Sequence, residues 1–199
     1  MREQQVPSST DHFIAAVNTL QPFTPEENEW LKRAFLPRQV KAGDLLVEQG
    51  ERSSHLFFLV DCYCRKYHVD TTGDEVTSEF NLPGMVCGDY YGFYNQQQAF
   101  ESLQAITDGN VMAIKYQDLQ DLYNRSFNMN VLGRKLLEQA CLSREVWLKK
   151  IVPLPGIDKY NWFVSEFPEV NRVAQLKHIA SFLGLTPETL SRIRRKLIS

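Results

Sequence analysis

The stretch QLKHIASFLGLTPETLSRIRRK, residues 175–196, decides the fold of the C-terminal part of this chain. Apolar residues recur at i, i+3, i+4 and i+7 in its first half, LKHIASFL, which predicts a short amphipathic helix. Gly184 follows where a helix ends in a left-handed residue, a conformation that glycine adopts at the least cost. Thr186 then offers an N-cap hydroxyl and Pro187 a first-turn proline, so a second helix is predicted after a tight turn.

The predicted second helix has one apolar face and one polar face. Arginine and glutamate on the polar face suit base edges, because arginine pairs with guanine acceptors and glutamate accepts from the cytosine amine. Residues 172–199 hold six basic residues and one acidic residue, an excess that phosphate contacts require. The sequence therefore predicts a helix-turn-helix whose DNA-binding residues are Thr186, Glu188, Thr189, Ser191, Arg192, Arg194, Arg195, Lys196 and Lys177. An ordinary helical hairpin with a solvated basic face is the alternative.

Composition limits the class of protein. The 199 residues are 43% hydrophobic, enough for one large domain or two small ones, and the net charge of −2 makes the basic character local. No apolar run of membrane-spanning length and no secretory signal is visible, so we expect a cytoplasmic protein with no membrane partner. No catalytic constellation and no metal-ligand spacing occurs, so we expect neither an enzyme nor a metal site.

Residues 40–114 read as strands. Short apolar runs are separated by glycine turns at intervals of about ten residues, which is typical of an antiparallel barrel or jelly roll. Within VKAGDLLVEQG, residues 40–50, the spacing K-x-G-x-x-L-x-x-x-G is met by Lys41, Gly43, Leu46 and Gly50. This spacing resembles the opening of the cyclic-nucleotide-binding β-roll.

The two motifs together resemble the Crp/Fnr superfamily of bacterial transcription regulators over roughly residues 20–199. The ending IASFLGLTPETLSRIRRKL is similar to the recognition segment of that family. The resemblance implies an α+β chain: an antiparallel, jelly-roll-like β-roll (1–123), a dimerisation helix (124–152) and an all-α helix-turn-helix domain (153–199). It also implies a homodimer on a palindromic double-stranded DNA operator, with RNA polymerase as a further partner. Because Lys196 is followed by three residues in this sequence, we expect the helix-turn-helix domain to lack the full two-stranded wing of the family.

The segment that resembles the nucleotide cassette departs from the family pattern. GDYYGFYNQQQAFESLQA, residues 88–105, has Gln98-Ala99-Phe100 where the family has its phosphate-binding arginine. Residues 67–114 contain seven acidic residues and no lysine or arginine. Burying a phosphate without a cationic partner is unfavourable, so we expect no cyclic nucleotide and no other cofactor that the sequence identifies. The candidate effector pocket comprises Gly88, Asp89, Tyr90, Tyr91, Phe93 and Phe100. The alternative is that these aromatic side chains only fill the space left by the nucleotide.

A near-heptad apolar stripe predicts the dimer helix. Its predicted seam is Met129, Leu132, Leu136, Ala140, Ser143 and Trp147. Leu137, Cys141 and Leu148 widen the stripe on one flank, as expected for a helix covered both by a partner and by its own β-roll. A single buried helix in a monomer is the alternative.

The sequence thus predicts a sequence-specific DNA-binding transcription regulator with a β-roll sensor that does not bind cyclic AMP in the usual way. A ligand-binding or protein-interaction module with a vestigial DNA domain is one alternative. A thiol redox sensor using Cys62 and Cys64 is another, although incidental structural thiols account for the pair more simply.

Overall fold

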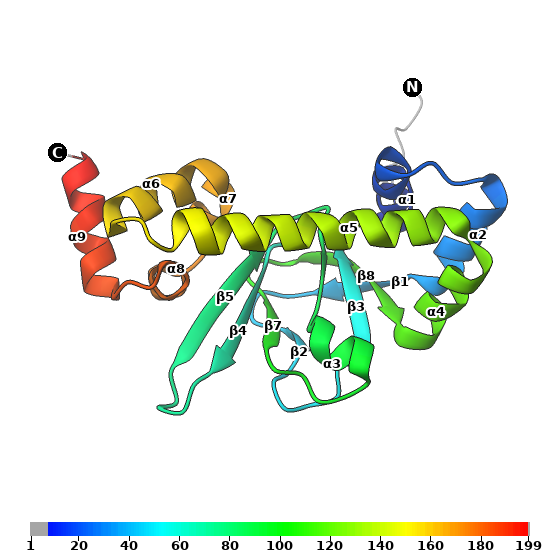
Figure 1. The fold of residues 1–199 in the computed structure, drawn as a ribbon, viewed down its shortest axis with the longest axis horizontal. Coiled ribbons are helices and arrows are strands. Elements are labelled where there is room, and N and C mark those ends of the chain that lie inside the picture. Colours follow the sequence, from blue (N-terminus) through cyan, green and yellow to red (C-terminus); the bar gives the residue numbers. More distant parts are fainter. Residues whose placement is uncertain (1–7, 199) are drawn as a thin grey trace, which may run out of the picture.

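The computed structural model describes residues 8–198 and contains three parts along the chain (Figure 1). A β-roll with short helices at one end is crossed by one long helix, and a group of four helices lies at the other end of that helix. The predicted β-roll domain begins at residue 1, but residues 1–7 lie outside the described part. Among residues 8–198, none of the helices combines the length and hydropathy that a membrane span requires.

The roll consists of two four-stranded antiparallel sheets, with strand orders β1-β8-β3-β6 and β2-β7-β4-β5. The strands are β1 (Leu36–Val40), β2 (Leu45–Val47), β3 (His55–Leu59), β4 (Cys64–Val69), β5 (Glu75–Asn81), β6 (Val86–Cys87), β7 (Ser102–Ala105) and β8 (Gly109–Lys115). Large side chains of both sheets, such as Phe57, Leu59 and Leu103, are buried between them. The predicted antiparallel roll is confirmed.

Several of the helices begin at a side-chain cap. In chain order, the helices are α1 (Ser9–Leu20), α2 (Pro25–Ala34), α3 (Tyr90–Asn95), α4 (Tyr116–Arg125), α5 (Phe127–Val146), η1 (Trp147–Ile151), α6 (Gly156–Glu166), α7 (Pro168–Val173), α8 (Leu176–Leu183) and α9 (Pro187–Ile198). Thr24 and Glu27 form a capping box at α2, as the sequence predicts. Glu27 also accepts hydrogen bonds from Ser126 and Asn128, so α2 fixes the start of α5.

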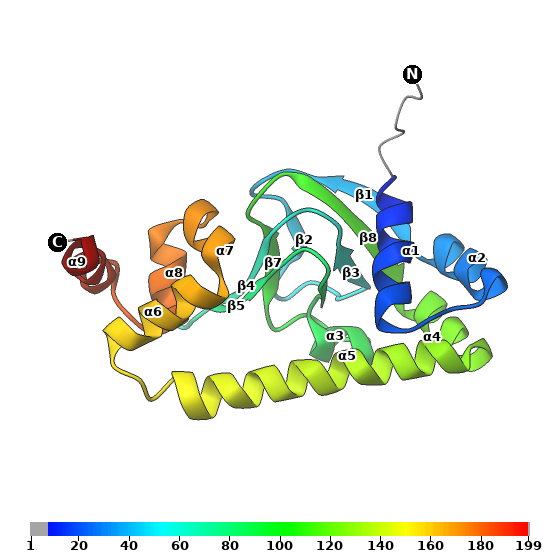
Figure 2. The same ribbon diagram turned by 90° about the horizontal axis from the view of Figure 1, so that it is seen from above.

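The long helix α5 continues into the π-helical turn η1 and ends at the linker 152–155. Figure 2 shows α5 running along one side of the roll, from α1 and α2 at one end to α6 at the other. Between Leu137 and Val146 every side chain of α5 is exposed. The predicted long helix is confirmed, and its middle lies open to a partner.

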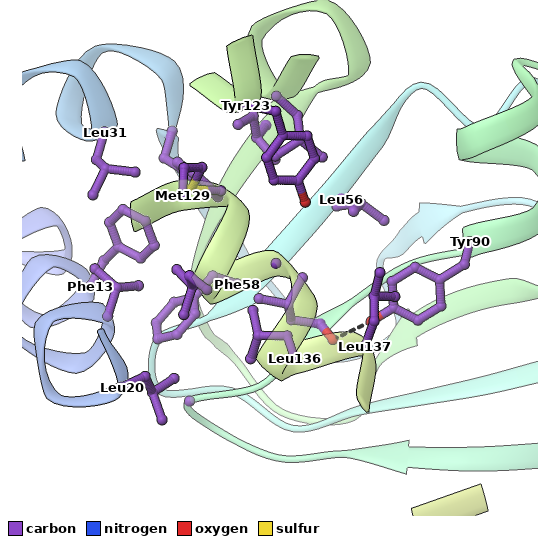
Figure 3. Close-up of a pocket in the computed structure, with 18 of the residues that line it drawn as sticks. Phe13, Leu20, Leu31, Leu56, Phe58, Tyr90, Tyr123, Met129, Leu136 and Leu137 are labelled. Carbon is purple, nitrogen blue, oxygen red and sulfur yellow. Dashed lines mark hydrogen bonds between the residues drawn. The ribbon is translucent and has the colours of Figure 1, made fainter. Parts of the chain in front are cut away.

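Most of the predicted dimer seam, however, packs against other parts of the same chain. Met129 and Leu132 are buried among α1, α2 and the roll, and Leu136 packs against the same cluster (Figure 3). Trp147 stacks on Phe182 of the C-terminal helices, with ring centroids 4.4 Å apart. These residues pack within the chain because the roll and the C-terminal helices lie on the same side of α5. Of the six predicted seam residues, Ala140 and Ser143 alone are fully exposed.

Candidate DNA-reading helix and effector cavity

Helices α8 and α9 lie where the sequence predicts the two helices of a helix-turn-helix. Gly184 has φ of 68° and ψ of 36°, the left-handed conformation expected of a helix C-cap glycine. The turn is closed by a hydrogen bond of 2.9 Å from Leu185 N to Ala180 O. Thr186 Oγ1 accepts from Thr189 N at 3.2 Å and so caps α9. The local sequence signals therefore position both helices as predicted.

The apolar faces of the two helices meet in one core. Ile179, Leu183 and Leu190 are almost completely buried and share a cluster with Phe163 of α6. Ile193, one turn after Leu190, is also buried there. Because these side chains fix the rotation of α9, its opposite face is held toward solvent.

The polar face of α9 is presented much as predicted. Thr189 and Ser191 are half-buried. The exposed members of the predicted set are Thr186, Glu188, Arg192, Arg195, Lys196 and, on α8, Lys177. Hydrogen bonds from the first backbone turn and from Thr186 lower the pKa of Glu188. The carboxylate is therefore ionised at neutral pH and acts as a hydrogen-bond acceptor beside the arginines.

Arg194 has a different place from the other basic residues. Its guanidinium donates to Tyr160 Oη at 2.9 Å and to Asn171 Oδ1 at 2.6 Å. Both partners belong to the same C-terminal domain, on α6 and α7. We therefore assign Arg194 to holding α9 on its neighbours, not to DNA. The sequence signal for this is spacing: Glu188, Ser191, Arg192 and Arg195 share one face at i, i+3, i+4 and i+7, and Arg194 lies off that face.

The C-terminal helices dock on the roll through α8 and β5, a contact that the sequence did not suggest. Thr77 N donates to Ser181 Oγ at 2.9 Å, and Phe80 packs edge-on against Phe182 with centroids 5.2 Å apart. The buried Arg65 of β4 lies 2.9 Å from His178 Nδ1 of α8 through its Nη1. We call Arg65, Thr77, Phe80, His178, Ser181 and Phe182 the docking contact.

The chemistry of this contact depends on a neutral imidazole. Burial lowers the pKa of His178 to about 4, and the charges of Arg65 and Lys177 act in the same direction. Glu75 opposes them, with its carboxylate 3.9 Å from His178 and 2.6 Å from Arg65. At neutral pH the unprotonated Nδ1 of His178 can therefore accept a hydrogen bond from Arg65.

A cavity lies on the roll, at the position of the predicted effector pocket. It is an open cavity of about 460 Å³. Of the predicted pocket residues, Asp89, Tyr90, Tyr91 and Phe100 line it. The Asp89 carboxylate already has partners within the chain, because it accepts hydrogen bonds from Gly92 N at 2.7 Å and from Phe100 N at 3.2 Å.

Two predicted pocket residues lie elsewhere. Phe93 is completely buried against Tyr94 and Tyr116, so it belongs to the core. Gly88 permits close packing of β3, since a Cβ there would lie 2.8 Å from Leu56 Cδ2. For Phe93 the space-filling alternative describes the structure better.

Lys66, Gln49, His68 and Glu101 line the cavity but were absent from the predicted set. Lys66 Nζ lies 2.8 Å from Glu79 and 3.5 Å from Glu101. Residues 67–114 contain no lysine or arginine, and the cation at the cavity comes from Lys66, the residue directly before this segment. The alternation of β4 places Lys66 and His68 on one face, and this signal could have identified them.

An apolar cavity of about 60 Å³ lies beside the polar one, between α1, α5 and β3 (Figure 3). Phe13, Phe58 and Leu136 are among its lining residues, and Tyr90 lines both cavities. The Tyr90 hydroxyl donates to Val86 O at 2.7 Å. Tyr90 is therefore the wall between the polar cavity and the base of α5.

The cysteines of the roll have surroundings that favour packing. Cys62, Cys64 and Cys87 are buried in the core between the sheets. A hydrogen bond to Cys62 raises the pKa of the Cys64 thiol, and burial raises that of Cys87, so thiolates are disfavoured at these two positions. The same hydrogen bond lowers the pKa of the buried Cys62. Within residues 8–198 no group of three histidine, cysteine or acidic side chains is placed to hold a metal ion.

Comparison with known proteins supports the fold. Residues 37–126 match the family described as the cyclic nucleotide-binding domain. No curated protein matches the sequence.

Three solved structures are similar over most of the chain. FixK2 from Bradyrhizobium japonicum is 21% identical, with a TM-score of 0.66, and covers 82% of this chain and 84% of its own. A putative regulator of the Crp/Fnr family from Eubacterium rectale is 15% identical, with a TM-score of 0.68, over 87% of this chain and 83% of its own. The c-di-GMP-responsive global regulator CLP from Xanthomonas campestris is 14% identical, with a TM-score of 0.69, over 87% and 91%. The chain therefore contains a cyclic nucleotide-binding domain fold and has the overall fold of Crp/Fnr regulators.

Proposed function

We propose that this protein is a homodimeric, sequence-specific DNA-binding transcription regulator of Crp/Fnr type. The observation that carries the proposal is the outward face of α9. Glu188, Arg192 and Arg195 lie on that face, above a core that fixes the rotation of the helix. A recognition helix needs this combination, because the side chains that contact base edges must be presented from a helix whose orientation is fixed.

Dimerisation is proposed through an exposed flank of α5 and η1, next to the side of the helix that packs on the roll. Leu137, Cys141 and Leu148 are spaced i, i+4 and i+11 and therefore share one face. All three are exposed, Leu137 by 45% and Leu148 by 51%. A second copy of this helix would bury the stripe, and it would set two α9 helices about one DNA turn apart.

This arrangement gives the dimer a direct test. Cys141 is exposed, whereas the other three cysteines are buried. Mild oxidation should therefore link two protomers through Cys141, and Cys141→Ser should abolish the linked band on a non-reducing gel. Buried Cys64→Ser is the matched control and should leave the crosslink unchanged. The interface would lie on another surface if sedimentation detected a dimer and oxidation at the same protein concentration gave no crosslinked band.

We further propose that the roll does not respond to cyclic AMP or cyclic GMP. Lys66, whose ammonium group reaches the cavity, already forms an ion pair with Glu79 at 2.8 Å, and Glu101 lies 3.5 Å away. The Asp89 carboxylate already accepts two backbone hydrogen bonds, so it is not free for a ribose hydroxyl. A cyclic phosphate would therefore enter a site with a net excess of carboxylates and no available cation.

DNA binding is tested by fluorescence anisotropy with a selected duplex and a scrambled one. Arg192→Ala should weaken the selected duplex by about 1–3 kcal/mol while leaving the scrambled duplex nearly unchanged. Lys196→Ala should weaken both duplexes alike and flatten the salt dependence by about one counterion. Arg33→Ala, an exposed arginine of α2, is the matched control. Equal affinity of the Arg192→Ala variant and wild type for the selected duplex would refute this orientation of α9.

A further inference from the structure

The polar cavity of the roll has a chemical character of its own, set by one aromatic wall and one charged wall. Tyr91 and Phe100 form the aromatic wall, with their rings stacked 4.1 Å apart at an interplanar angle of 13°. Tyr91 is 47% exposed and Phe100 is 59% exposed. An exposed, stacked aromatic pair at the mouth of a 460 Å³ cavity offers a flat surface to a ligand.

The charged wall consists of Lys66, His68 and Glu101, and Glu79, which does not line the cavity, is the ion-pair partner of Lys66. Lys66 Nζ is within hydrogen-bond distance of Glu79, at 2.8 Å, so these two charges neutralise each other. Glu101 is different: its oxygens lie 3.5 Å from Lys66 and 3.9 Å from His68, longer than a direct hydrogen bond. The Glu101 side chain is 23% exposed and faces the cavity. The cavity thus holds a carboxylate with spare capacity to accept hydrogen bonds.

From these two walls we propose that the cavity binds a small organic cation, an ammonium or guanidinium group attached to a flat apolar body. The cationic head pairs with Glu101, and the flat body stacks on the Tyr91 and Phe100 rings. This inference deepens the proposed function, and rests on it, by naming the class of effector that the sensor domain recognises.

The same charges exclude anionic ligands. To receive a phosphate or carboxylate, Lys66 would have to leave Glu79, and both Glu79 and Glu101 would remain beside the new anion. Like charges at such short range are strongly unfavourable in a partly buried site. A cation meets the opposite situation, because Glu101 gains a partner while the Lys66–Glu79 pair stays intact.

A ligand at this place is well situated to influence the DNA-reading helices. Lys66 and Arg65 are neighbours on β4, and their side chains lie on opposite faces of that strand. Lys66 lines the cavity, whereas Arg65 contacts His178 of α8 in the docking contact. Movement of β4 on ligand binding is therefore transmitted to the helix-turn-helix without any intervening element.

Isothermal titration of the full-length protein with a pair of probes of matched shape tests the ligand class. The probes are 2-phenylethylammonium and 3-phenylpropanoate, with benzylguanidinium as a second cation. Both cations should bind, and the carboxylate should give no heat. Glu101→Gln should weaken the cations at least tenfold, and Phe100→Leu should weaken them severalfold. Glu166→Gln, an exposed position on α6, is the matched control and should bind as wild type does.

Several results would overturn the inference. These are the absence of binding by either cation at 10 mM, equal binding of the anionic probe, or undiminished binding by Glu101→Gln. Thermal unfolding of each variant establishes that the fold is retained. The titration needs no DNA, so the two proposals can fail separately. If the protein binds the cations but selects no DNA, the proposed function is refuted and the cation site is supported. If the protein binds specific DNA but no cation, only the cation site is refuted.

Discussion

Replacing Arg65 by methionine should release the C-terminal helices from the roll. Arg65 is 2% exposed, and its guanidinium reaches both domains. It donates to Glu75 at 2.6 Å and to Gln104 at 2.8 and 2.9 Å, and its Nη1 lies 2.9 Å from His178. Methionine retains much of the apolar stem but none of these contacts, so the substitution isolates the polar part of the docking contact.

The magnitude follows from what the substitution leaves behind. Hydrogen bonds to charged groups contribute about 1.5–3 kcal/mol each, and breaking a buried ion pair costs about 3–5 kcal/mol. Two effects reduce this: the buried guanidinium no longer has to be desolvated, and Glu75, whose side chain is 39% exposed, regains water. We therefore expect a net loss of about 2–3 kcal/mol in the free energy of unfolding.

Urea unfolding followed by tryptophan fluorescence measures this loss, since Trp147 and Trp162 lie in the same cluster as Phe80 and α8. Arg33→Met, at an exposed position of α2, is the control and should stay within about 0.5 kcal/mol of wild type. Trypsin should also cleave Arg65→Met faster at the exposed Lys149 and Lys150, next to the linker. A change below about 0.5 kcal/mol, with unaltered cleavage, would refute the assigned role of Arg65.

Three further predictions concern the dimer, the cavity and pH. Leu137→Glu should give monomers in analytical ultracentrifugation, whereas Leu142→Glu, on another face of α5, should leave the dimer intact; a dimeric Leu137→Glu protein would move the interface. Calorimetric titration with cyclic AMP or cyclic GMP should give no binding up to millimolar concentration, because Lys66 is already paired; micromolar binding would contradict this. Lowering the pH from 6.5 toward 4 should weaken the docking contact by up to about 3 kcal/mol, because His178 takes up a proton below 6.5 when undocked and below about 4 when docked. His178→Gln should remove that dependence, and an unchanged slope in urea unfolding would show that another group is responsible.

Local signals in the sequence predicted the two helices α8 and α9 and the turn between them well. Gly184, Thr186 and the apolar spacing of α8 and α9 act over a few residues, and the structure places each as expected. The roll was predictable for the same reason, since its glycine turns and apolar runs mark the strands one by one. Basic composition did not reveal that the Arg194 guanidinium donates hydrogen bonds to Tyr160 and Asn171 within the C-terminal helices.

Features that join distant parts of the chain could not be predicted in this way. A stripe on α5 shows that one side is buried, but it does not show what buries it, and Met129 and Leu132 turned out to pack within the chain. Lys66 lines the cavity although it precedes the cassette segment 88–105 by more than twenty residues. Arg65 contacts His178, which lies 113 residues later in the sequence. Such pairings depend on sheet order and domain placement, which periodicity does not encode.

Selection of DNA from a random duplex pool by the purified protein tests the central claim most directly. We predict enrichment of one nearly palindromic sequence whose half-sites are about 10 base pairs apart, centre to centre, as two α9 helices in a two-fold dimer require. The selected site should bind at least about a thousandfold more tightly than random duplex at physiological salt. A pool that stays random after repeated rounds, or a selected site without two-fold symmetry, would contradict the account.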